Sequence, residues 1–481
     1  MPGAGIEPAA SGPNALQIMS FAPLAWLALY QLSHPGPTNK TGSVGNNVLC
    51  HPNRAQNCLM INVACSECRL DQTGMEFDYL TLDDLDLREK RVLLRLDINS
   101  PLDPTTNQIL DDTRIVAAKF TLDALTEARV AVLSHQSRPG KDDFTSLKQH
   151  AELLQKNCSQ NVRFIDDVMG PAAREAIKQV QKGEVLVLDN VRFCSEENVE
   201  DTGEKLAKTN LVSRLAALFD LYVNDAFAAA HRSQASLVAF PYVLPSAAGR
   251  LMEKELSTLK RLLKDPERPS TYILGGAKIE DKVPVIENIL ATGCADHVLV
   301  GGNVAKVFLK AEGQRFDKSE EGELAKASDQ VKKAKQILAK HRKRILMPSD
   351  FGTLSSGKRV ETSIQKVVRA GTVLDIGAQT AERFATIINE SRTVVASGPL
   401  GVFERDGFES GTKTILEAMA ISSAFTVIGG GHLAGYAGIL GIADKFSHVS
   451  TAGGAMLSLL AGEELPAIKA LVEAAKRQER G

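Results

Sequence analysis

The chain has 481 residues, of which 44% are apolar and 24% are charged, and its formal net charge at pH 7 is -2. This length is enough for two or more domains with sizeable cores, and the nearly neutral balance excludes a generally basic surface for nucleic acid or anionic membrane. We therefore expect no nucleic-acid and no membrane partner. The seven cysteines form no regular pattern in the main body, which favours a reducing, cytoplasmic compartment.

The first 74 residues differ in character from the rest. They are rich in Pro, Gly, Asn and Cys, and they show no sustained helical or strand period. An apolar stretch at 15–32 contains Pro23 and follows no positive charge, which disfavours a signal sequence. Four cysteines at 50–68 could form a small zinc knuckle, but their spacing matches no common finger. We favour Met75 as the natural start and expect residues 1–74 to be a disordered or non-native extension.

Strands and helices alternate from residue 75 onwards. A strand at 92–96, a helix at 115–125 and a strand at 130–133 form a first unit, and the crossover makes its two strands parallel. The next elements are a helix at 146–156, a strand at 162–165, a helix at 171–181, a strand at 184–193, a helix at 211–219 and a strand at 221–224. This alternation predicts a doubly wound α/β domain with a parallel sheet.

Polar side chains follow the strands of this first domain, and arginines recur among them. In open parallel sheets, ligands bind outside the carboxyl ends of the strands, and guanidinium forks bind phosphate and carboxylate through two N–H groups. A site of this kind would hold a small, multiply charged acid. The residues expected to form it are Asp97, Asn99, Arg114, His135, Arg138, Arg192 and Arg232.

A predicted helix at 244–263 connects the two halves, and a strand at 271–274 then leads into GGAKIEDK at 275–282. This is a glycine turn followed by a helix start with Lys278 and Lys282 about one turn apart. The Walker A pattern is absent. Glycine nevertheless lets the backbone approach phosphate, and lysine supplies positive charge.

Further strands are expected at 297–300, 344–347, 373–376 and 393–396, and two more glycine turns follow strands. One is SGPLGVFE at 397–404. The other is AFTVIGGGHLAG at 424–435, where a helix is expected to start at His432 and to direct its positive end at any phosphate. Several such turns in one half predict a second phosphate-binding α/β domain.

The blocks RLDINSPL, DDTRI, SHQSRP, DNVRF, VNDAFAAAHRSQAS and LPSAAGRLMEKEL, in this order, resemble the signature of phosphoglycerate kinase. The forms DIN and HQSRPG, with the loop PLDPTTNQILDDTR, are most similar to its archaeal-type branch. The resemblance runs from about Met75 almost to the C-terminus. It implies reversible phosphoryl transfer from 1,3-bisphosphoglycerate to ADP, which gives 3-phosphoglycerate and ATP in glycolysis and gluconeogenesis.

The resemblance also implies roles for particular residues. The arginine site would bind 3-phosphoglycerate, and Arg114 and Lys282 would be catalytic. The nucleotide, with Mg²⁺ as Mg-ADP or Mg-ATP, would be bound by Lys278, Lys282, Glu404, Gly429, Gly430, Gly431 and His432.

Two residues depart from the family pattern. His432 replaces the common aspartate, and imidazole is a poor ligand for Mg²⁺, so the metal would be held mainly by phosphate oxygens, water or another carboxylate. Ser397 replaces the usual asparagine, which puts a nucleotide contact at that position in doubt. No protein metal ligand is therefore predicted.

For the fold, we expect two doubly wound, Rossmann-like parallel-sheet domains joined by a hinge helix, with an active-site cleft between them. The predicted parts are 75–245, the hinge helix 246–264 and the nucleotide domain 265–450. By resemblance, 451–481 returns to the first domain. Closure of the two domains would bring the substrates together and exclude water, in a monomer or a homodimer.

Two other functions remain open on the residues alone. Gly429, Gly431 and Ala434 satisfy the dinucleotide pattern GxGxxG/A, as in a nicotinamide-dependent oxidoreductase. That reading needs an acidic residue at a strand end about 20 residues further on, whereas Asp444 comes too early and Glu463 has the wrong context. The second alternative is a protein that binds an anion through the same arginines without turnover.

Overall fold

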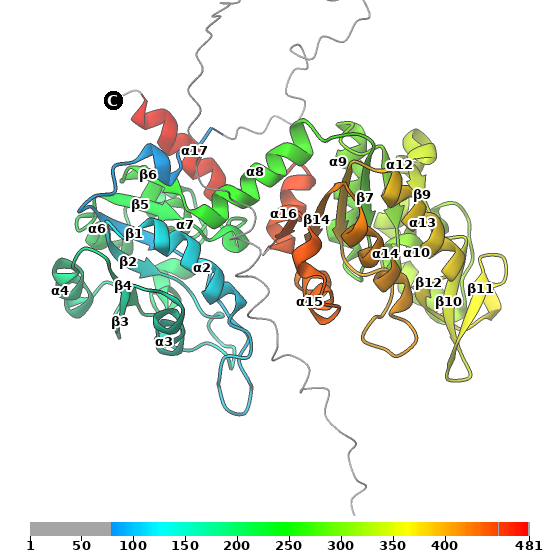
Figure 1. The fold of residues 1–481 in the computed structure, drawn as a ribbon, viewed down its shortest axis with the longest axis horizontal. Helices are drawn as coiled ribbons and strands as arrows, with labels where there is room; N and C mark the ends of the chain where they lie inside the picture. The colour runs from blue at the N-terminus through cyan, green and yellow to red at the C-terminus, as the bar shows by residue number, and fades with distance from the viewer. Residues whose placement is uncertain (1–77, 451, 480–481) are drawn as a thin grey trace, which may run out of the picture.

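The structure, a computed structural model, describes residues 78–450 and 452–479. The proposed start at Met75, the extension 1–74 and its cysteine cluster lie outside the described residues. The described part contains two six-stranded sheets and one three-stranded sheet. The first large sheet lies on the left of Figure 1 and the second on the right. Among the described helices, none has the length and apolar character needed to span a bilayer.

The first sheet is parallel throughout and has the strand order β3-β4-β2-β1-β5-β6. Its central strands are short apolar runs buried on both faces, as in other sheets covered by helices on two sides. The strands are β1 (Arg91–Arg95), β2 (Arg129–Leu133), β3 (Asn161–Ile165), β4 (Glu184–Leu188), β5 (Leu221–Asn224) and β6 (Ser246–Ala248). The helices are α2 (Thr113–Ala124), α3 (Lys148–Asn157), α4 (Pro171–Gln179), α5 (Gly203–Leu206), α6 (Asn210–Ala216) and α7 (Ala235–Val238).

The second large sheet is also parallel, with the order β15-β14-β13-β7-β8-β9. Its strands are β7 (Ser270–Leu274), β8 (His297–Val300), β9 (Ile345–Leu346), β13 (Thr393–Ser397), β14 (Phe425–Gly429) and β15 (His448–Ser450). Its helices are α9 (Ile279–Ala291), α10 (Gly302–Ala311), α11 (Lys318–Lys326), α12 (Ser328–His341), α13 (Ala378–Glu390), α14 (Ser410–Ile421) and α15 (Gly431–Ile439). The predicted fold class, two doubly wound parallel-sheet domains, is confirmed.

A small antiparallel sheet is an addition that we did not predict. It has the order β11-β10-β12, formed by β10 (Asp350–Ser355), β11 (Lys358–Ser363) and β12 (Thr372–Ile376). β10 and β11 are joined through Ser356 and Gly357, whose φ angles of 49° and 78° are typical of a tight hairpin turn. The strand predicted at 373–376 therefore belongs to this sheet and not to the parallel one.

Two predicted element boundaries were wrong. The connector is not one helix from residue 244, because Ser246–Ala248 pairs with β5 as β6 and helix α8 spans Arg250–Lys264. The carboxylate of Asp225 accepts hydrogen bonds from the backbone N–H groups of Leu251 and Met252, which fixes the start of α8. The strand predicted at 184–193 ends at Leu188, and a 3₁₀ turn follows at Val191–Phe193.

The C-terminal helices α16 (Gly453–Leu460) and α17 (Pro466–Gln478) contact the first half of the chain. The Tyr242 hydroxyl donates to Glu473 Oε2 at 2.7 Å, and Arg477 donates to a backbone carbonyl at 2.8 Å while lying over the Tyr242 ring. In Figure 1, α17 lies against the first domain, and α8 and α16 lie between the two large sheets. A continuous cluster of buried apolar residues joins the two sheets through these helices.

Candidate functional site

The predicted anion site lies at the carboxyl ends of the first sheet's central strands. Arg95, the last residue of β1, pairs in register with Leu133 of β2 and Asn224 of β5. Side chains that follow these three strands therefore emerge at one edge of the sheet. Asp97 follows β1 and His135 follows β2, so the strand register alone makes them neighbours.

Arg114, in the first turn of α2, is oriented by the loop after β1. Its Nη1 donates to Asp97 Oδ1 at 3.1 Å and to the Asn99 carbonyl at 3.4 Å. Burial tends to raise the pKa of Asp97, but the nearby positive charges, of which Arg114 is the strongest, hold it below its usual value. Asp97 is therefore a carboxylate at neutral pH. The side chain of Arg114 is 36% exposed, which leaves part of its donor fork open to an anion.

His135 is buried and oriented by Arg95, whose Nη2 lies 3.1 Å from His135 Nδ1. A guanidinium can only donate hydrogen bonds, so Nδ1 must accept. Burial holds the pKa of His135 well below its usual value, and the attraction of Asp97 offsets this only in part. The imidazole is thus neutral and carries its proton on Nε2, as a single N–H donor.

Arg95 itself was not predicted as a site residue. It is fully buried, and its Nε donates to Ser236 Oγ at 2.8 Å. Ser236 in turn donates to the carboxylate of Glu197 from both its hydroxyl and its backbone N–H. In the sequence it is an arginine inside the strand predicted at 92–96, and no functional role was assigned to it.

Arg192 and Arg232 add positive charge beside His135. Burial lowers the pKa of Arg192 to about 10, and the charges of Arg232 and Arg95 add to the effect. Arg192 donates to the Ser137 carbonyl and to Gln234 Oε1. Its Nε is buried and has no hydrogen-bond partner among the described residues. Crowded guanidiniums and an unpaired buried donor make this cluster suitable for an anion.

Two further predicted residues have different surroundings. Asn99 Oδ1 accepts the backbone N–H of Ser137 at 2.7 Å, so Asn99 joins the loops after β1 and β2. Arg138 is exposed in the second of these loops, and no described hydrogen bond or ion pair joins its side chain to the cluster. Its role in binding stays a prediction.

In the second sheet, the predicted glycine turns also meet at strand ends. Ser397, which ends β13, pairs in register with Leu274 of β7 and Gly429 of β14. Gly398 has φ 82°, and a Cβ there would lie 2.3 Å from a backbone oxygen of the β7 turn. Gly430 has φ 100° at the N-cap of α15. Both positions favour glycine because of their positive φ angles. The turns after β7 and β13 approach each other closely, and the strand register places the turn after β14 at the same edge of the sheet.

Lys282 lies among these turns. It is buried in α9, and its Nζ donates to Ser397 Oγ at 2.6 Å. Burial lowers the pKa of Lys282 to about 8, with a smaller contribution from Lys278, whereas Asp281 opposes the shift. Ser397, whose nucleotide contact was in doubt, is therefore a partner of Lys282. Lys278 is exposed at the N-cap of α9.

Glu404 and His432 are exposed at the rim of this region. The ring of Phe403, next to Glu404, lies edge-on to His432 with 6.4 Å between centroids, so the 397–404 turn and α15 are adjacent. Within 78–450 and 452–479, no three His, Cys, Asp or Glu side chains are arranged to hold a metal ion.

Helix α8 is attached to both halves. Asp225, after β5, caps its first turn, and Glu255 in its middle lies 2.9 Å from His448 Nε2 of β15, with both side chains buried. Helix α8 is therefore one of the elements that connect the two sheets, together with α16 and the continuous apolar cluster.

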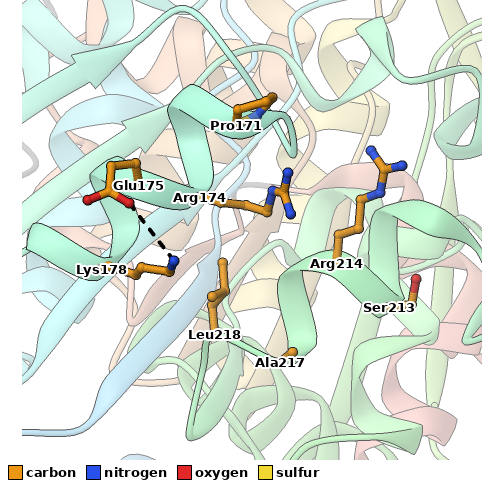
Figure 2. A pocket seen from close by; sticks show the side chains of 8 residues that line it. All are labelled: Pro171, Arg174, Glu175, Lys178, Ser213, Arg214, Ala217 and Leu218. Carbon is orange, nitrogen blue, oxygen red and sulfur yellow. Dashed lines mark ion pairs between the residues drawn. The ribbon is translucent and has the colours of Figure 1, made fainter.

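A separate surface groove of about 410 Å³ lies between α4 and α6. Figure 2 shows Arg174 and Arg214 on its two walls, and Lys178 paired with Glu175 at 3.9 Å. None of the predicted site residues lines this groove. It is therefore distinct from both clusters described above.

The family model described as phosphoglycerate kinase matches residues 82–463. The curated phosphoglycerate kinase of Methanothermus fervidus is 46% identical to the chain, and the match covers 84% of this chain and 99% of the relative. That of Methanothermobacter thermautotrophicus is also 46% identical, and the match covers 83% of this chain and 98% of the relative. The crystal structure of the Pyrococcus horikoshii enzyme is similar with a TM-score of 0.76 and 41% identity, covering 83% of this chain and all of that one. A Coxiella burnetii phosphoglycerate kinase structure has a TM-score of 0.71 and 35% identity, covering 82% and 100%.

Proposed function

We propose, since the chain belongs to the phosphoglycerate kinase family, that it transfers a phosphoryl group reversibly from 1,3-bisphosphoglycerate to ADP. Both the family and its archaeal-type branch, predicted from the sequence blocks, are confirmed. Members of this family are phosphotransferases, so the chain is an enzyme. The roles of individual residues, the metal and the domain movement are proposals that follow from the geometry.

The three-carbon acid binds at the strand ends of the first sheet. The observation that carries this assignment is the crowding of Arg95, Arg192 and Arg232 around neutral His135, with a buried Nε of Arg192 left unpaired. Arg114 joins the same site through its ion pair with Asp97. A ligand with a phosphate and a carboxylate would satisfy that donor and reduce the repulsion between the guanidiniums. Asn99 and Arg138 would extend the same site.

The nucleotide binds at the strand ends of the second sheet. The turns around Gly398 and Gly429–Gly431 allow close backbone approach, and the N-terminus of α15 favours negative charge. Lys278 and Lys282 supply positive charge to the phosphates, and Glu404 is a candidate for the ribose. Mg²⁺ enters as part of the Mg-nucleotide, held mainly by phosphate oxygens and water, the oxygen ligands that this ion prefers.

In the direction of ATP synthesis, a terminal phosphate oxygen of ADP attacks the phosphorus of the acyl phosphate. The bond from phosphorus to the carboxyl oxygen breaks, and 3-phosphoglycerate leaves as a carboxylate. The attacking oxygen is already ionised at neutral pH, so the step needs alignment and charge neutralisation and no strong base. We assign that neutralisation to Arg114 from the first half and Lys282 from the second.

Because the two substrates bind to different sheets, the halves must close on each other for transfer. Helix α8, attached through Asp225 and Glu255, is the proposed hinge element, with domains at 75–245 and 265–450 and a C-terminal segment from 451. We further propose a cytoplasmic enzyme that acts as a monomer or a homodimer.

A coupled assay of ATP formation tests the function directly. The full chain, given 1,3-bisphosphoglycerate and Mg-ADP, should produce ATP. If the chain forms no ATP but reduces added NAD⁺ or NADP⁺ with an oxidisable hydroxy acid, the oxidoreductase alternative would be favoured. Tight binding of 3-phosphoglycerate without ATP formation would favour the anion-binding alternative.

A further inference from the structure

Gln136 is a fully buried amide next to His135, and its hydrogen-bonding capacity is used completely. Its Nε2 donates to the carbonyls of Ser100 at 2.9 Å and Asp143 at 3.3 Å. Its Oε1 accepts the backbone N–H of Ser100 at 3.0 Å and lies 3.0 Å from His150 Nε2. An amide offers two donors and two acceptor lone pairs, so this side chain can adopt no other orientation without losing bonds.

His150, in the first full turn of α3, holds this amide in place. It is buried, and burial lowers its pKa to about 4, so it is neutral at physiological pH. The amide oxygen can only accept, so the imidazole proton is on Nε2, and Nδ1 has no described partner. His150 therefore makes one described side-chain hydrogen bond, and that bond orients Gln136.

Through its neighbours, Gln136 connects the loops that carry the anion site. Both bonds to Ser100 fix the loop after β1, which contains Asn99. The backbone carbonyl of Gln136 accepts from Asn190 Nδ2 at 2.8 Å, and Asn190 Oδ1 accepts the backbone N–H of Arg192 at 3.1 Å. The loops after β1, β2 and β4 thus meet at Gln136, whose side chain binds the loop after β1 and whose backbone carbonyl binds the loop after β4.

The loops that Gln136 holds are bonded directly to two arginines of the anion site. Arg114 donates to the carbonyl of Asn99, and Arg192 donates to the carbonyl of Ser137. Ser137 has φ 55°, in the left-handed region that non-glycine residues rarely adopt, and its N–H donates to Asn99 Oδ1. A strained residue keeps this conformation only where its surroundings determine it, and Gln136 is the buried anchor immediately before it.

We propose that Gln136, held by His150, is a positioning residue for 3-phosphoglycerate. It touches no substrate and acts by fixing the relative positions of the loops that orient Arg114 and Arg192. This inference rests on the proposed function of the first-sheet site. It predicts that loss of the Gln136 amide weakens binding of the acid and leaves nucleotide binding unchanged.

The test compares the full chain with Gln136→Met, His150→Phe and His150→Gln by calorimetric titration with 3-phosphoglycerate and, separately, with Mg-ADP. Gln136→Met should raise the Kd for 3-phosphoglycerate about tenfold or more, because several buried bonds are lost together. His150→Phe, which removes one donor, should raise it about threefold or more. His150→Gln, which can donate again, should restore affinity to within about twofold of the unmodified chain. Mg-ADP affinity should be unchanged throughout.

Gln160→Met is the matched control. Gln160 is also a buried amide of the first half, but it donates to the Leu122 carbonyl at the far end of α2 from Arg114. This variant should lower Tm without changing the Kd for 3-phosphoglycerate. An equal loss of affinity in Gln160→Met would overturn the inference, because it would show a general effect of destabilisation.

Normal 3-phosphoglycerate affinity in both Gln136→Met and His150→Phe would also overturn the inference. If Gln136→Met does not fold, the two His150 variants decide the matter. Failure of the unmodified chain to bind 3-phosphoglycerate would overturn the proposed function first, and this inference with it, so the two failures are distinguishable.

Discussion

The protonation state of Lys282 should control nucleotide affinity at alkaline pH. Burial lowers the pKa of this lysine to about 8, and its ammonium group donates to Ser397 Oγ. Above that pKa the free protein carries a neutral amine, and binding a polyphosphate then requires prior uptake of a proton. The affinity for Mg-ADP should therefore fall as the pH rises through about 8. The affinity falls with rising pH because only the protonated lysine neutralises phosphate charge.

The size of the effect follows from the same pKa. At about pH 9 the neutral form exceeds the charged form roughly tenfold, so the Kd for Mg-ADP should be about tenfold higher than at pH 7.5. The phosphates are fully ionised across this range, because their second pKa is about 6, and they contribute no slope. Lys282→Met, of similar length and without charge, should bind Mg-ADP about 10- to 100-fold more weakly at pH 7.5, the loss expected for a charge-assisted hydrogen bond.

The assay is calorimetric titration of Mg-ADP between about pH 7.5 and 9.5 at constant ionic strength, with circular dichroism at each pH to show that the protein stays folded. Lys282→Met should have weak affinity that does not change with pH. The reasoning would be refuted if the unmodified protein bound equally well at both ends of the range. It would also be refuted if Lys282→Met kept the same decline.

Arg114→Ala should reduce kcat by several orders of magnitude and leave the Kd for Mg-ADP within about twofold, because the role proposed for Arg114 is to stabilise the transferring phosphoryl group. Steady-state kinetics and nucleotide titration would contradict this role if ADP binding failed while turnover stayed normal. His432→Ala should change the Kd for Mg-ADP by less than about threefold, because we propose that phosphate oxygens, and not the imidazole, hold the metal. A loss of Mg²⁺-dependent binding in this variant would show that the imidazole is a ligand. Tyr242→Phe removes the hydrogen bond to Glu473 and should lower the free energy of unfolding by about 1 kcal/mol. An unchanged denaturation midpoint would show that this contact does not stabilise the packing of α17.

Much of the site could be predicted because its residues follow strands. In a parallel sheet, each strand end is marked by a change from apolar to polar residues, so Asp97, His135 and Arg192 were visible without a structure. Arg95 was not, because it lies within the strand itself and its partners Ser236 and Glu197 are more than 100 residues away in sequence. Buried polar networks that depend on distant partners leave little local trace in a sequence.

The errors in the fold have local causes. The three small residues of β6 carry no helix or strand period, and only pairing with β5 makes them a strand. The β10–β11 hairpin left a sign that we did not use, namely Ser356-Gly357 between two short runs rich in β-branched and polar residues. The strand from Glu184 was predicted too long, because Val191 and Phe193 continue its apolar character after the chain has turned.

We propose that the first sheet binds 3-phosphoglycerate and that the second sheet binds the nucleotide. Hydrogen–deuterium exchange of the full chain, with and without each ligand, tests it most directly. We predict that 3-phosphoglycerate slows exchange in the loops at 97–100, 135–138 and 190–192, and that Mg-ADP slows exchange at 275–282 and 429–432. Protection of the second set by 3-phosphoglycerate alone, with the first set unaffected, would contradict the account.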